Sequence, residues 1–449
     1  MAVDVIVVGG GIVGASIARE LAVRGRRTLL LEQGSFGGAV TGASLACVGT
    51  HMNGRAEIEL LKWACEAWAG LDRTLGRDFE YRRCGQLRFV AQPEDLPNAR
   101  GWVEFERAAG LPPELLSPAE VRRIEPALTG PIVAASWSPG DAMVTPFLAV
   151  RALLADAVGH GLELRAHAPV QGFLRRGAAV GGVVTPAGPV EAEAVVLAAG
   201  PWTGRLAALA GLGLPIRPRR AQCLATPALP PTIRTVVGAC ESAGGVMAGY
   251  TQIQQAPSGQ VLFNTVLGGG VSDPGAEEQV PEVDPVFVCN SIDTLLWLFP
   301  SLGEAELLRS WVRYEAVTPD DLFIVGPAGP PGLLALPATA APASPAPRHR
   351  PGDRRRAGRA GAALRRRHVV ARPLRAGRRG MSGRVTLLVD GQRLEAEATA
   401  SLAAALLAAG QRRLRTTARA GEPRGVFCGM GVCFDCLVTV DGRPGCAPA

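Results

Sequence analysis

Four cysteines close together near the end of the chain could bind metal. Cys428, Cys433 and Cys436 have the spacing C-x4-C-x2-C, and nine residues separate Cys436 from Cys446. This spacing is typical of plant-type [2Fe-2S] proteins, in which thiolates on a tight loop hold two irons. A structural zinc site is the alternative, but such sites usually pair two short Cys/His dyads, and no histidine lies in this region. The pattern favours an iron–sulfur cluster, with Cys446 as a candidate fourth ligand.

A dinucleotide-binding pattern occupies the start of the chain. The apolar run Asp4–Val8 leads into G-x-G-x-x-G, a helical pattern over Ala15–Arg24, and a second apolar run, Arg27–Leu31, followed by Glu32. In such a unit the glycines let backbone approach a pyrophosphate, the helix N-terminus attracts phosphate, and the acid accepts hydrogen bonds from a ribose diol. A glycine-rich turn without a ligand is the alternative, but the complete order of elements favours a dinucleotide site. The residues expected to form it are Gly9, Gly11, Ile12, Val13, Gly14, Glu32 and Gln33.

The cysteines need a scaffold, and the sequence before them indicates one. Val385–Val389 is typical of a strand, Asp390-Gly391 of a tight turn, and Ser401–Ala409 of a helix, with a second short strand between turn and helix. A hairpin followed by a helix is typical of a ferredoxin-like β-grasp. We therefore expect a ferredoxin-like [2Fe-2S] module over residues 381–449.

Four further segments resemble the D-amino-acid-oxidase-like flavoenzymes. They match a small-residue loop, a backbone contact to adenine, a strand with its A-x-G-x-W turn, and a late strand with T-P-D and I-x-G-P, at Gly37–Gly49, Ala168–Val170, Val195–Trp202 and Trp311–Pro327. In that family these segments surround the cofactor, so the resemblance implies FAD rather than NAD. The additional cofactor contacts that it implies are Gly42, Ala43, Ser44, Val170, Ala199, Gly200 and Trp202.

The same resemblance implies an architecture. We expect an α/β protein with a doubly wound, Rossmann-like FAD domain over residues 1–335, assembled from separate stretches of chain. A mainly antiparallel α+β substrate domain would be inserted at about Gly85–Met143 and Thr226–Ser310.

The cysteine loop carries a second resemblance. Pro423–Gly442 is similar to the small ferredoxin-like subunit of bacterial multi-subunit amine dehydrogenases, such as D-hydroxyproline dehydrogenase and opine oxidase. In those subunits the fourth cysteine lies further along the chain, within V-R-A-C, so Cys446 departs from the pattern. The resemblance implies partner subunits, a separate electron acceptor, and electrons that leave the flavin through the cluster.

The basic charge is confined to one stretch. Leu336–Gly380 holds 13 arginines and a single acid, Asp353, and without it the chain has 34 basic and 39 acidic residues. Nucleic-acid binding through this stretch is one interpretation, but it has no interleaved aromatic residues, and we expect no nucleic-acid partner. A disordered Ala/Arg/Pro-rich linker is another. The third is a frameshift: with synonymous codons, a shifted frame can read Leu336–Pro345 as A-G-H-S-G-x-G-F-A, a loop that the flavin family carries here. In that case Met381 would begin a separate small subunit.

Together the motifs imply oxidation of a C–N bond in a small amine, amino acid or imino acid, by hydride transfer to flavin. The alternative is a non-catalytic flavin or electron-transfer subunit of a multi-subunit amine dehydrogenase. Candidate catalytic residues are His51, Tyr250 and Arg313, although a structural role is as common for such residues. Many relatives carry an arginine where this chain has Glu315, which favours a substrate other than a simple D-amino acid.

The remaining features bear on location. No segment offers about 18 uninterrupted apolar residues, so no transmembrane helix is expected. Six cysteines outside the cluster are scattered without motif spacing and are expected to be reduced thiols. We expect a cytoplasmic protein.

Overall fold

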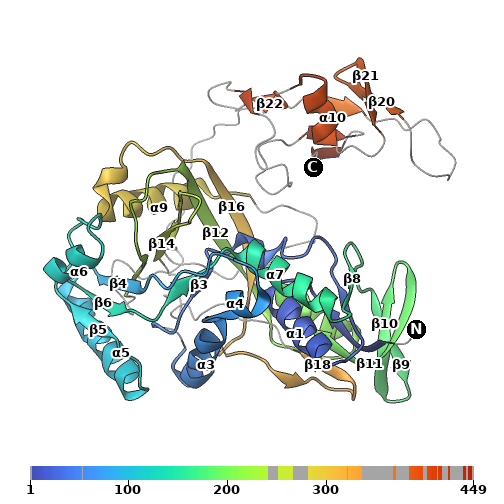
Figure 1. The fold of residues 1–449 in the computed structure, drawn as a ribbon, viewed down its shortest axis with the longest axis horizontal. Coiled ribbons are helices and arrows are strands. Elements are labelled where there is room, and N and C mark those ends of the chain that lie inside the picture. Colours follow the sequence, from blue (N-terminus) through green and yellow to red (C-terminus); the bar gives the residue numbers. More distant parts are fainter. Residues whose placement is uncertain are drawn as a thin grey trace, which may run out of the picture. The chain divides into compact units, whose positions relative to one another are not determined.

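The structure is a computed structural model. It describes residues 3–52, 54–240, 251–265, 282–320, 322–335, 368–370, 384–397, 402–411, 413–416, 423–424, 438–440 and 443–446. The chain divides into two compact units, Met1–His349 and Arg350–Ala449, and each is described by itself (Figure 1).

The first unit contains a mostly parallel sheet that begins with the dinucleotide-binding pattern. Its strands follow the order β17-β18-β11-β1-β2-β8, with β17 as an antiparallel edge strand. The strands are β1 (Val3–Val8), β2 (Thr28–Leu31), β8 (Glu163–Arg165), β11 (Gly188–Leu197), β17 (Gly326–Pro327) and β18 (Leu333–Ala335). Because β1 and β2 are apolar throughout and buried on both faces, they read as continuous hydrophobic runs.

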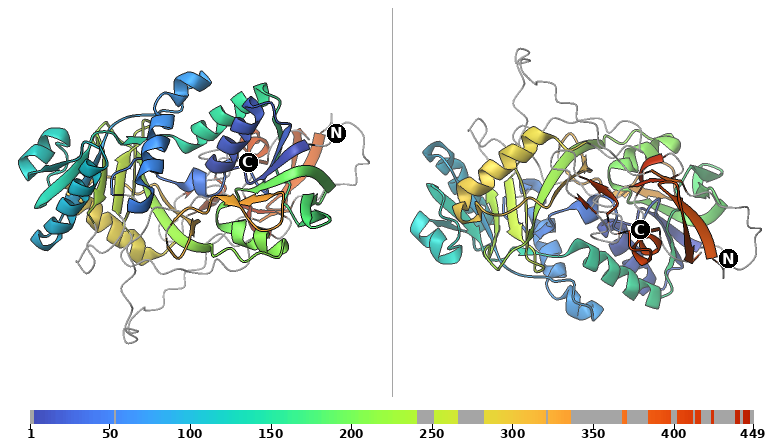
Figure 2. Two further views of the ribbon diagram at one scale, coloured as in Figure 1. Left: turned by 90° about the horizontal axis from the view of Figure 1, so that it is seen from below. Right: turned by 90° about the horizontal axis from the view of Figure 1, so that it is seen from above.

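Helices cover one face of this sheet, and a helix and a hairpin cover the other. Helices α1 (Ile12–Val23) and α7 (Pro146–Gly159) lie side by side on the first face (Figures 1 and 2), and the buried alanines of α1 allow close packing. Helix α8 (Thr203–Leu209) and strands β9 (Gly172–Arg176) and β10 (Ala179–Thr185) cover the second face. The layers place the carboxyl ends of β1, β2 and β11 at one edge.

A second sheet of the same unit has the order β16-β12-β15-β14-β13-β4-β6-β5, and only the β13–β4 pair is parallel. Its strands are β4 (Gln86–Val90), β5 (Glu114–Leu116), β6 (Ala134–Ser138), β12 (Arg217–Ala228), β13 (Val236–Ala239), β14 (Thr251–Gln255), β15 (Gln260–Thr265) and β16 (Arg309–Val317). The helices associated with it are α5 (Leu96–Ala108), α6 (Pro118–Ile124) and α9 (Pro285–Leu298). The sheet therefore draws on residues before Thr226 and after Ser310, because β12 begins at Arg217 and β16 ends at Val317.

The two faces of the second sheet differ in chemistry, because alternate residues of a strand point to opposite faces. One face is apolar and packs against α9 through residues such as Leu87, Leu224 and Phe263. The opposite face carries buried polar side chains, at Gln86, Arg88, Ser136, Gln252, Gln254 and Asn264.

Short elements connect the two sheets. Helix α2 (Val40–Ala43) precedes β3 (Cys47–Val48), which pairs with β7 (Ala142–Met143). The others are η1 (Arg55–Glu57), α3 (Ile58–Trp68), α4 (Leu71–Leu75), η2 (Pro93–Asp95), η3 (Gly200–Trp202) and η4 (Pro300–Leu302). The loop from α2 through β3 is thus held between the first sheet and strand β7, which follows β6 in the chain.

The second unit contains a five-stranded sheet of order β21-β20-β19-β24-β25. Its elements are β19 (His368–Val370), β20 (Arg384–Val389), β21 (Gln392–Glu397), α10 (Leu402–Ala408), β24 (Val438–Val440) and β25 (Arg443–Cys446), with β22 (Arg415–Thr416) and β23 (Pro423–Arg424) paired separately. The predicted hairpin, turn and helix are confirmed, with Asp390 and Gly391 at φ 48° and 84° in the turn. No helix in the described parts of the chain is long and apolar enough to cross a membrane.

Candidate functional site

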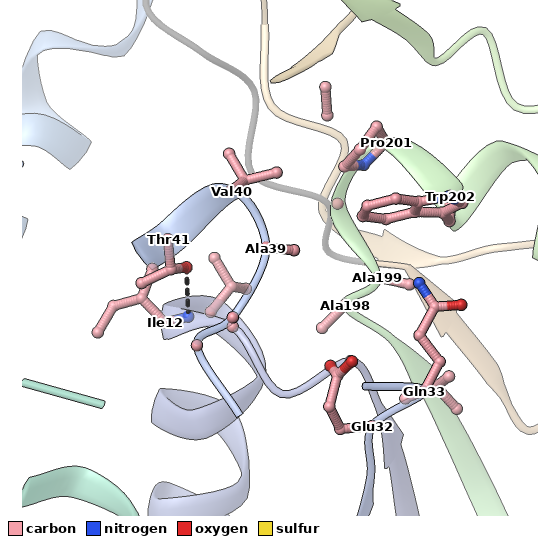
Figure 3. Close-up of a pocket in the computed structure, with 18 of the residues that line it drawn as sticks. Ile12, Glu32, Gln33, Ala39, Val40, Thr41, Ala198, Ala199, Pro201 and Trp202 are labelled. Atoms are coloured by element: carbon pink, nitrogen blue, oxygen red, sulfur yellow. Dashed lines mark hydrogen bonds between the residues drawn. The ribbon is translucent and has the colours of Figure 1, made fainter. Parts of the chain in front are cut away.

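A cavity of about 770 Å³ lies at the carboxyl ends of the parallel strands, the edge where open α/β sheets bind ligands. Its lining comes from the β1–α1 turn, the end of β2, the segment Gly37–Val48, the segment Ala168–Gln171 and the turn Ala198–Trp202. Figure 3 shows Pro201 and Trp202 across the hollow from Ala39–Thr41, with Glu32 and Gln33 at the end of β2. The cavity size is typical of a site that encloses a small molecule or cofactor.

The glycines of the fingerprint leave no room for side chains. Gly9 has φ 110°, and a Cβ on it would lie 2.5 Å from the carbonyl oxygen of Ala198. A Cβ on Gly14 would lie 1.8 Å from the carbonyl oxygen of Gly9, so Gly14 allows α1 to approach β1. Gly11 is the N-cap residue of helix α1 and has no side chain that could cap the helix. Instead, Thr41 Oγ1 accepts a 3.0 Å hydrogen bond from the Ile12 amide (Figure 3).

Glu32 is fixed at the tip of β2 by backbone on both sides. Its Oε2 accepts a hydrogen bond of 2.6 Å from the Gly10 amide, and its Oε1 accepts one of 2.7 Å from the Gly34 amide. Because a carboxylate has about four acceptor positions, two remain for the hydroxyl groups of a ribose. An anion-attracting helix end, close glycines and a held carboxylate together fit a dinucleotide cofactor.

The segment Gly37–Val48 is tied to the second sheet as well as to the cavity. The indole Nε1 of Trp311 donates a 2.9 Å hydrogen bond to the carbonyl oxygen of Ala43. The side-chain amide of Gln254 donates to the carbonyl oxygen of Leu45. Burial raises the pKa of the Cys47 thiol well above its usual range, so this cysteine is a neutral part of the wall.

Most of the predicted cofactor contacts line the cavity, and three do not. Those that line it are Gly9, Gly11, Ile12, Val13, Glu32, Gln33, Ser44, Val170, Ala199, Gly200 and Trp202. Gly14, Gly42 and Ala43 contribute to packing around it: a Cβ on Gly42 would lie 2.3 Å from the Phe147 ring. Sequence reasoning did not identify Thr41 or Ala46–Val48, although both lie in the small-residue loop that it singled out.

The candidate catalytic residues are dispersed. The His51 side chain is fully buried between Glu106 and Ser136 and does not line the cavity. Arg313 lies on β16, where burial lowers the pKa of its guanidinium, and it does not line the cavity either. Tyr250 lies outside the described residues.

Glu315 faces a cation on the neighbouring strand. Its Oε2 lies 2.8 Å from Nη2 of Arg219 on the neighbouring strand β12. This ion pair lies on the same face of the sheet as Trp311 and Arg313, because all three β16 residues alternate with buried Val312 and Ala316.

The predicted metal ligands fall largely outside the described structure. Cys428, Cys433 and Cys436 are not among the described residues, and Cys446 is described only as part of the backbone of β25. These ligands therefore stay a prediction from spacing.

Comparison with known proteins agrees with the geometry. A family model described as FAD dependent oxidoreductase matches residues 4–339. The chain belongs to this family. A second model, described as a 2Fe-2S iron-sulfur cluster binding domain, matches residues 382–449. FAD is accordingly the cofactor of the first unit, and the C-terminal part is a [2Fe-2S] cluster-binding domain.

The flavoprotein part is similar to several characterised oxidoreductases. It is 29% identical over 332 residues to glycine oxidase from Geobacillus kaustophilus, with 72% of this chain and 84% of that protein covered. It is 32% identical over 329 residues to anaerobic glycerol-3-phosphate dehydrogenase subunit A1 from Haloferax volcanii, with 69% and 53% covered. The structure of L-proline dehydrogenase from P. horikoshii superimposes with a TM-score of 0.69 at 26% identity, covering 75% of this chain and 87% of that one.

Proposed function

We propose that this flavoprotein oxidises a C–N bond of a small amine, amino acid or imino acid and passes the electrons to its [2Fe-2S] domain. The observation that carries the proposal is the single cavity that runs from the fingerprint and Glu32 to the wall at Ala46–Val48. Two of the similar proteins, glycine oxidase and L-proline dehydrogenase, are named for substrates that carry a C–N bond. The whole chain has both an FAD part and a cluster-binding part, which suits a dehydrogenase.

FAD, when bound, supplies a hydride acceptor for the carbon next to the substrate nitrogen. The residues of this chain bind the cofactor and orient the substrate. The helix N-terminus of α1 and Glu32 hold the dinucleotide end, and Ser44–Val48 form the far wall. The polar face of the second sheet offers Gln252, Gln254 and Asn264 for substrate recognition.

A substrate carboxylate requires a cation, and Arg313 is our candidate. It lies on the same face of β16 as Trp311, whose indole contacts the small-residue loop. Its guanidinium can bind a carboxylate with two parallel hydrogen bonds. Tyr250 remains a candidate from the sequence alone, whereas the buried His51 does not line the cavity. A substrate other than a simple D-amino acid is favoured by Glu315.

We also propose that partner subunits and a separate electron acceptor complete the enzyme, since the cluster-binding part resembles a subunit of multi-subunit dehydrogenases. We place the protein in the cytoplasm, because six cysteines of the described structure are free thiols.

The Ala/Arg/Pro-rich stretch Leu336–Gly380 remains part of the proposal as a linker or an out-of-frame stretch. Reading the gene on both strands decides this: in-frame codons throughout would end the frameshift interpretation, and overlapping intact frames would establish it.

Anaerobic reduction of the full chain tests the function. The visible absorption bands of the oxidised flavin should bleach with at least one member of a panel of glycine, sarcosine, D-amino acids, proline, hydroxyproline and opines. Bleaching by glycerol 3-phosphate alone would replace C–N with C–O oxidation. No bleaching by any compound, with dithionite still reducing the flavin, would favour the non-catalytic carrier.

A further inference from the structure

The loop that forms the far wall of the cavity continues into a buried group of titratable side chains. Cys47 and Val48 line the cavity, and the His51 side chain, three residues further on, has 0% of its surface exposed. His51 Nδ1 lies 2.8 Å from Oε2 of Glu106 on α5, and its Nε2 lies 2.9 Å from Oγ of Ser136 on β6. The ring is thus held from two different elements of the second sheet layer.

Two buried carboxylates hold the backbone of the same segment. Glu106 Oε1 accepts a 2.7 Å hydrogen bond from the Met52 amide. The oxygens of Asp141, which directly precedes β7, accept 3.2 Å hydrogen bonds from the amides of Thr50 and His51. We call His51, Glu106 and Asp141 the anchor cluster.

The anchor cluster is itself rigidly supported. Ser138 Oγ donates a 2.9 Å hydrogen bond to Asp141 Oδ1. The amide nitrogen of Gln86, in the orientation that satisfies both of its polar atoms, lies 2.9 Å from Asp141 Oδ2. A Cβ on Gly49 would lie 2.1 Å from that same oxygen, so the loop backbone is pressed against the carboxylate. Burial raises the pKa of Asp141, since ionisation there is poorly solvated.

Backbone conformation shows that this segment needs support. Ala46 and Met52, which bound it, have φ of 58° and 54°. Left-handed conformations cost residues with a Cβ roughly 1–2 kcal/mol each, and they persist only where the surroundings determine them. Between these two residues, β3 pairs with β7, and Cys47 lies opposite Met143.

We propose that the anchor cluster positions the flavin: it fixes Gly49–Met52 against the second sheet and thereby holds the cavity wall at Cys47 and Val48. The cluster does not touch the cavity, so its members are positioning residues. Through them the second sheet is joined to the cavity wall at Cys47 and Val48. The inference rests on the binding of FAD and not on the identity of the substrate.

Charge-removing, size-preserving substitutions test this. Asp141→Asn places an amide NH₂ where an oxygen faces two donors, and Glu106→Gln replaces one of the two oxygens that face the Met52 amide and the His51 ring, so the segment shifts. We expect a changed visible spectrum and midpoint potential of the bound flavin. With any substrate that the panel identifies, the rate constant for flavin reduction should fall roughly 10- to 100-fold, as misplaced reacting groups do.

The matched control is Glu125→Gln. Glu125 is also a fully buried carboxylate beside the second sheet and also accepts backbone amides, from Arg234 and Thr235, but it does not line or border the cavity loop. It should alter the melting temperature and leave the flavin spectrum and potential unchanged. Ser136→Ala serves where the Asp141 and Glu106 variants do not fold, because it removes only the partner of His51 Nε2. It should change the flavin spectrum and midpoint potential in the same direction but by a smaller amount.

Wild-type spectrum, potential and reduction rate in folded anchor-cluster variants, with only the melting temperature lowered, would overturn the proposal. A wild-type protein without flavin absorbance would instead contradict the proposed function. The spectrum and potential decide the role of the cluster even if no panel member reduces the flavin.

Discussion

The indole of Trp311 and the backbone of Ala43 are joined by a hydrogen bond across 268 positions of sequence, from Nε1 to the carbonyl oxygen at 2.9 Å. Trp311 belongs to β16 of the second sheet, and Ala43 ends the short helix α2 beside the cavity. The face of the ring also stacks with the Arg309 guanidinium at 4.8 Å. This bond ties the second sheet to the segment Gly37–Val48 through residues that do not belong to the anchor cluster.

Trp311→Phe should remove that bond while keeping an aromatic surface for Arg309. The Ala43 carbonyl would lose its partner, so we expect the free energy of unfolding to fall by about 1 kcal/mol and FAD to bind more weakly. Denaturant unfolding and a fluorescence titration with FAD measure both. The control is Trp297→Phe, since Trp297 lies in α9 against Phe89. It should lower the free energy of unfolding without changing the FAD affinity. Equal FAD affinities of the two variants would contradict the role of the Trp311 bond.

Gly14→Ala should abolish the cofactor site. The new Cβ would lie 1.8 Å from the Gly9 carbonyl, and only separation of α1 from β1 relieves that clash. Gly101→Ala is the matched control, since Gly101 lies inside α5 with nothing within 4 Å of its would-be Cβ. It should stabilise the protein by roughly 0.5–1 kcal/mol. Flavin content after purification reports the outcome, and a normally loaded Gly14→Ala protein would refute the fingerprint interpretation.

What the sequence could predict was local chemistry. The glycines, the helix and Glu32 follow one another within a short stretch of the chain. Their spacing was therefore sufficient to predict the turn and the helix end that line the cavity. The residues that predict the strands and the turn of the C-terminal hairpin also lie close together in the sequence. The hydrogen bond from the Ile12 amide to the Thr41 hydroxyl joins residues that are 29 positions apart. It was not predictable, because the contact exists only after the sheet has formed. The contacts of His51 with Glu106 and Asp141 were not predictable for the same reason. From the sequence, His51 was a candidate catalytic residue with a structural role as the alternative, and in the structure its side chain is buried.

Glu32→Ala should weaken FAD binding. The carboxylate is held by the amides of Gly10 and Gly34, ready to accept hydrogen bonds from a ribose. Hydrogen bonds to charged groups contribute about 1.5–3 kcal/mol, so the dissociation constant should rise roughly 10- to 100-fold. Glu59→Ala, whose side chain is 76% exposed on α3, should leave the constant unchanged. A Glu32 variant with native affinity would place the ribose elsewhere.

Glu125→Gln should change the pH dependence of stability. Burial raises the pKa of Glu125, whose Oε1 has no hydrogen-bond partner within the described structure. Because the folded pKa exceeds the unfolded value of about 4.3, folding favours the protonated form, and the penalty of ionisation grows as pH rises through the folded pKa. The stability of the native chain relative to Glu125→Gln should therefore be greatest below the unfolded pKa and fall as the pH rises through the raised folded pKa. Denaturation midpoints at several pH values measure the difference, and a constant difference would show that Glu125 ionises normally.

Substitution of the cysteines should separate the two cofactors. The domain matched over residues 382–449 contains only Cys428, Cys433, Cys436 and Cys446, and a [2Fe-2S] cluster bound by thiolates requires four ligands. Alanine at any of the four should therefore abolish the iron–sulfur absorbance and the electron paramagnetic resonance signal of the reduced protein, while the flavin content stays constant. Cys289→Ala, at an exposed position of α9, should change neither. Cys446→Ala is the decisive variant, because Cys446 comes earlier than the fourth cysteine of the resembling subunits: a cluster that survives there must take its fourth ligand from another side chain or chain. A cluster that survives alanine at Cys428, Cys433 or Cys436 would contradict the spacing argument itself.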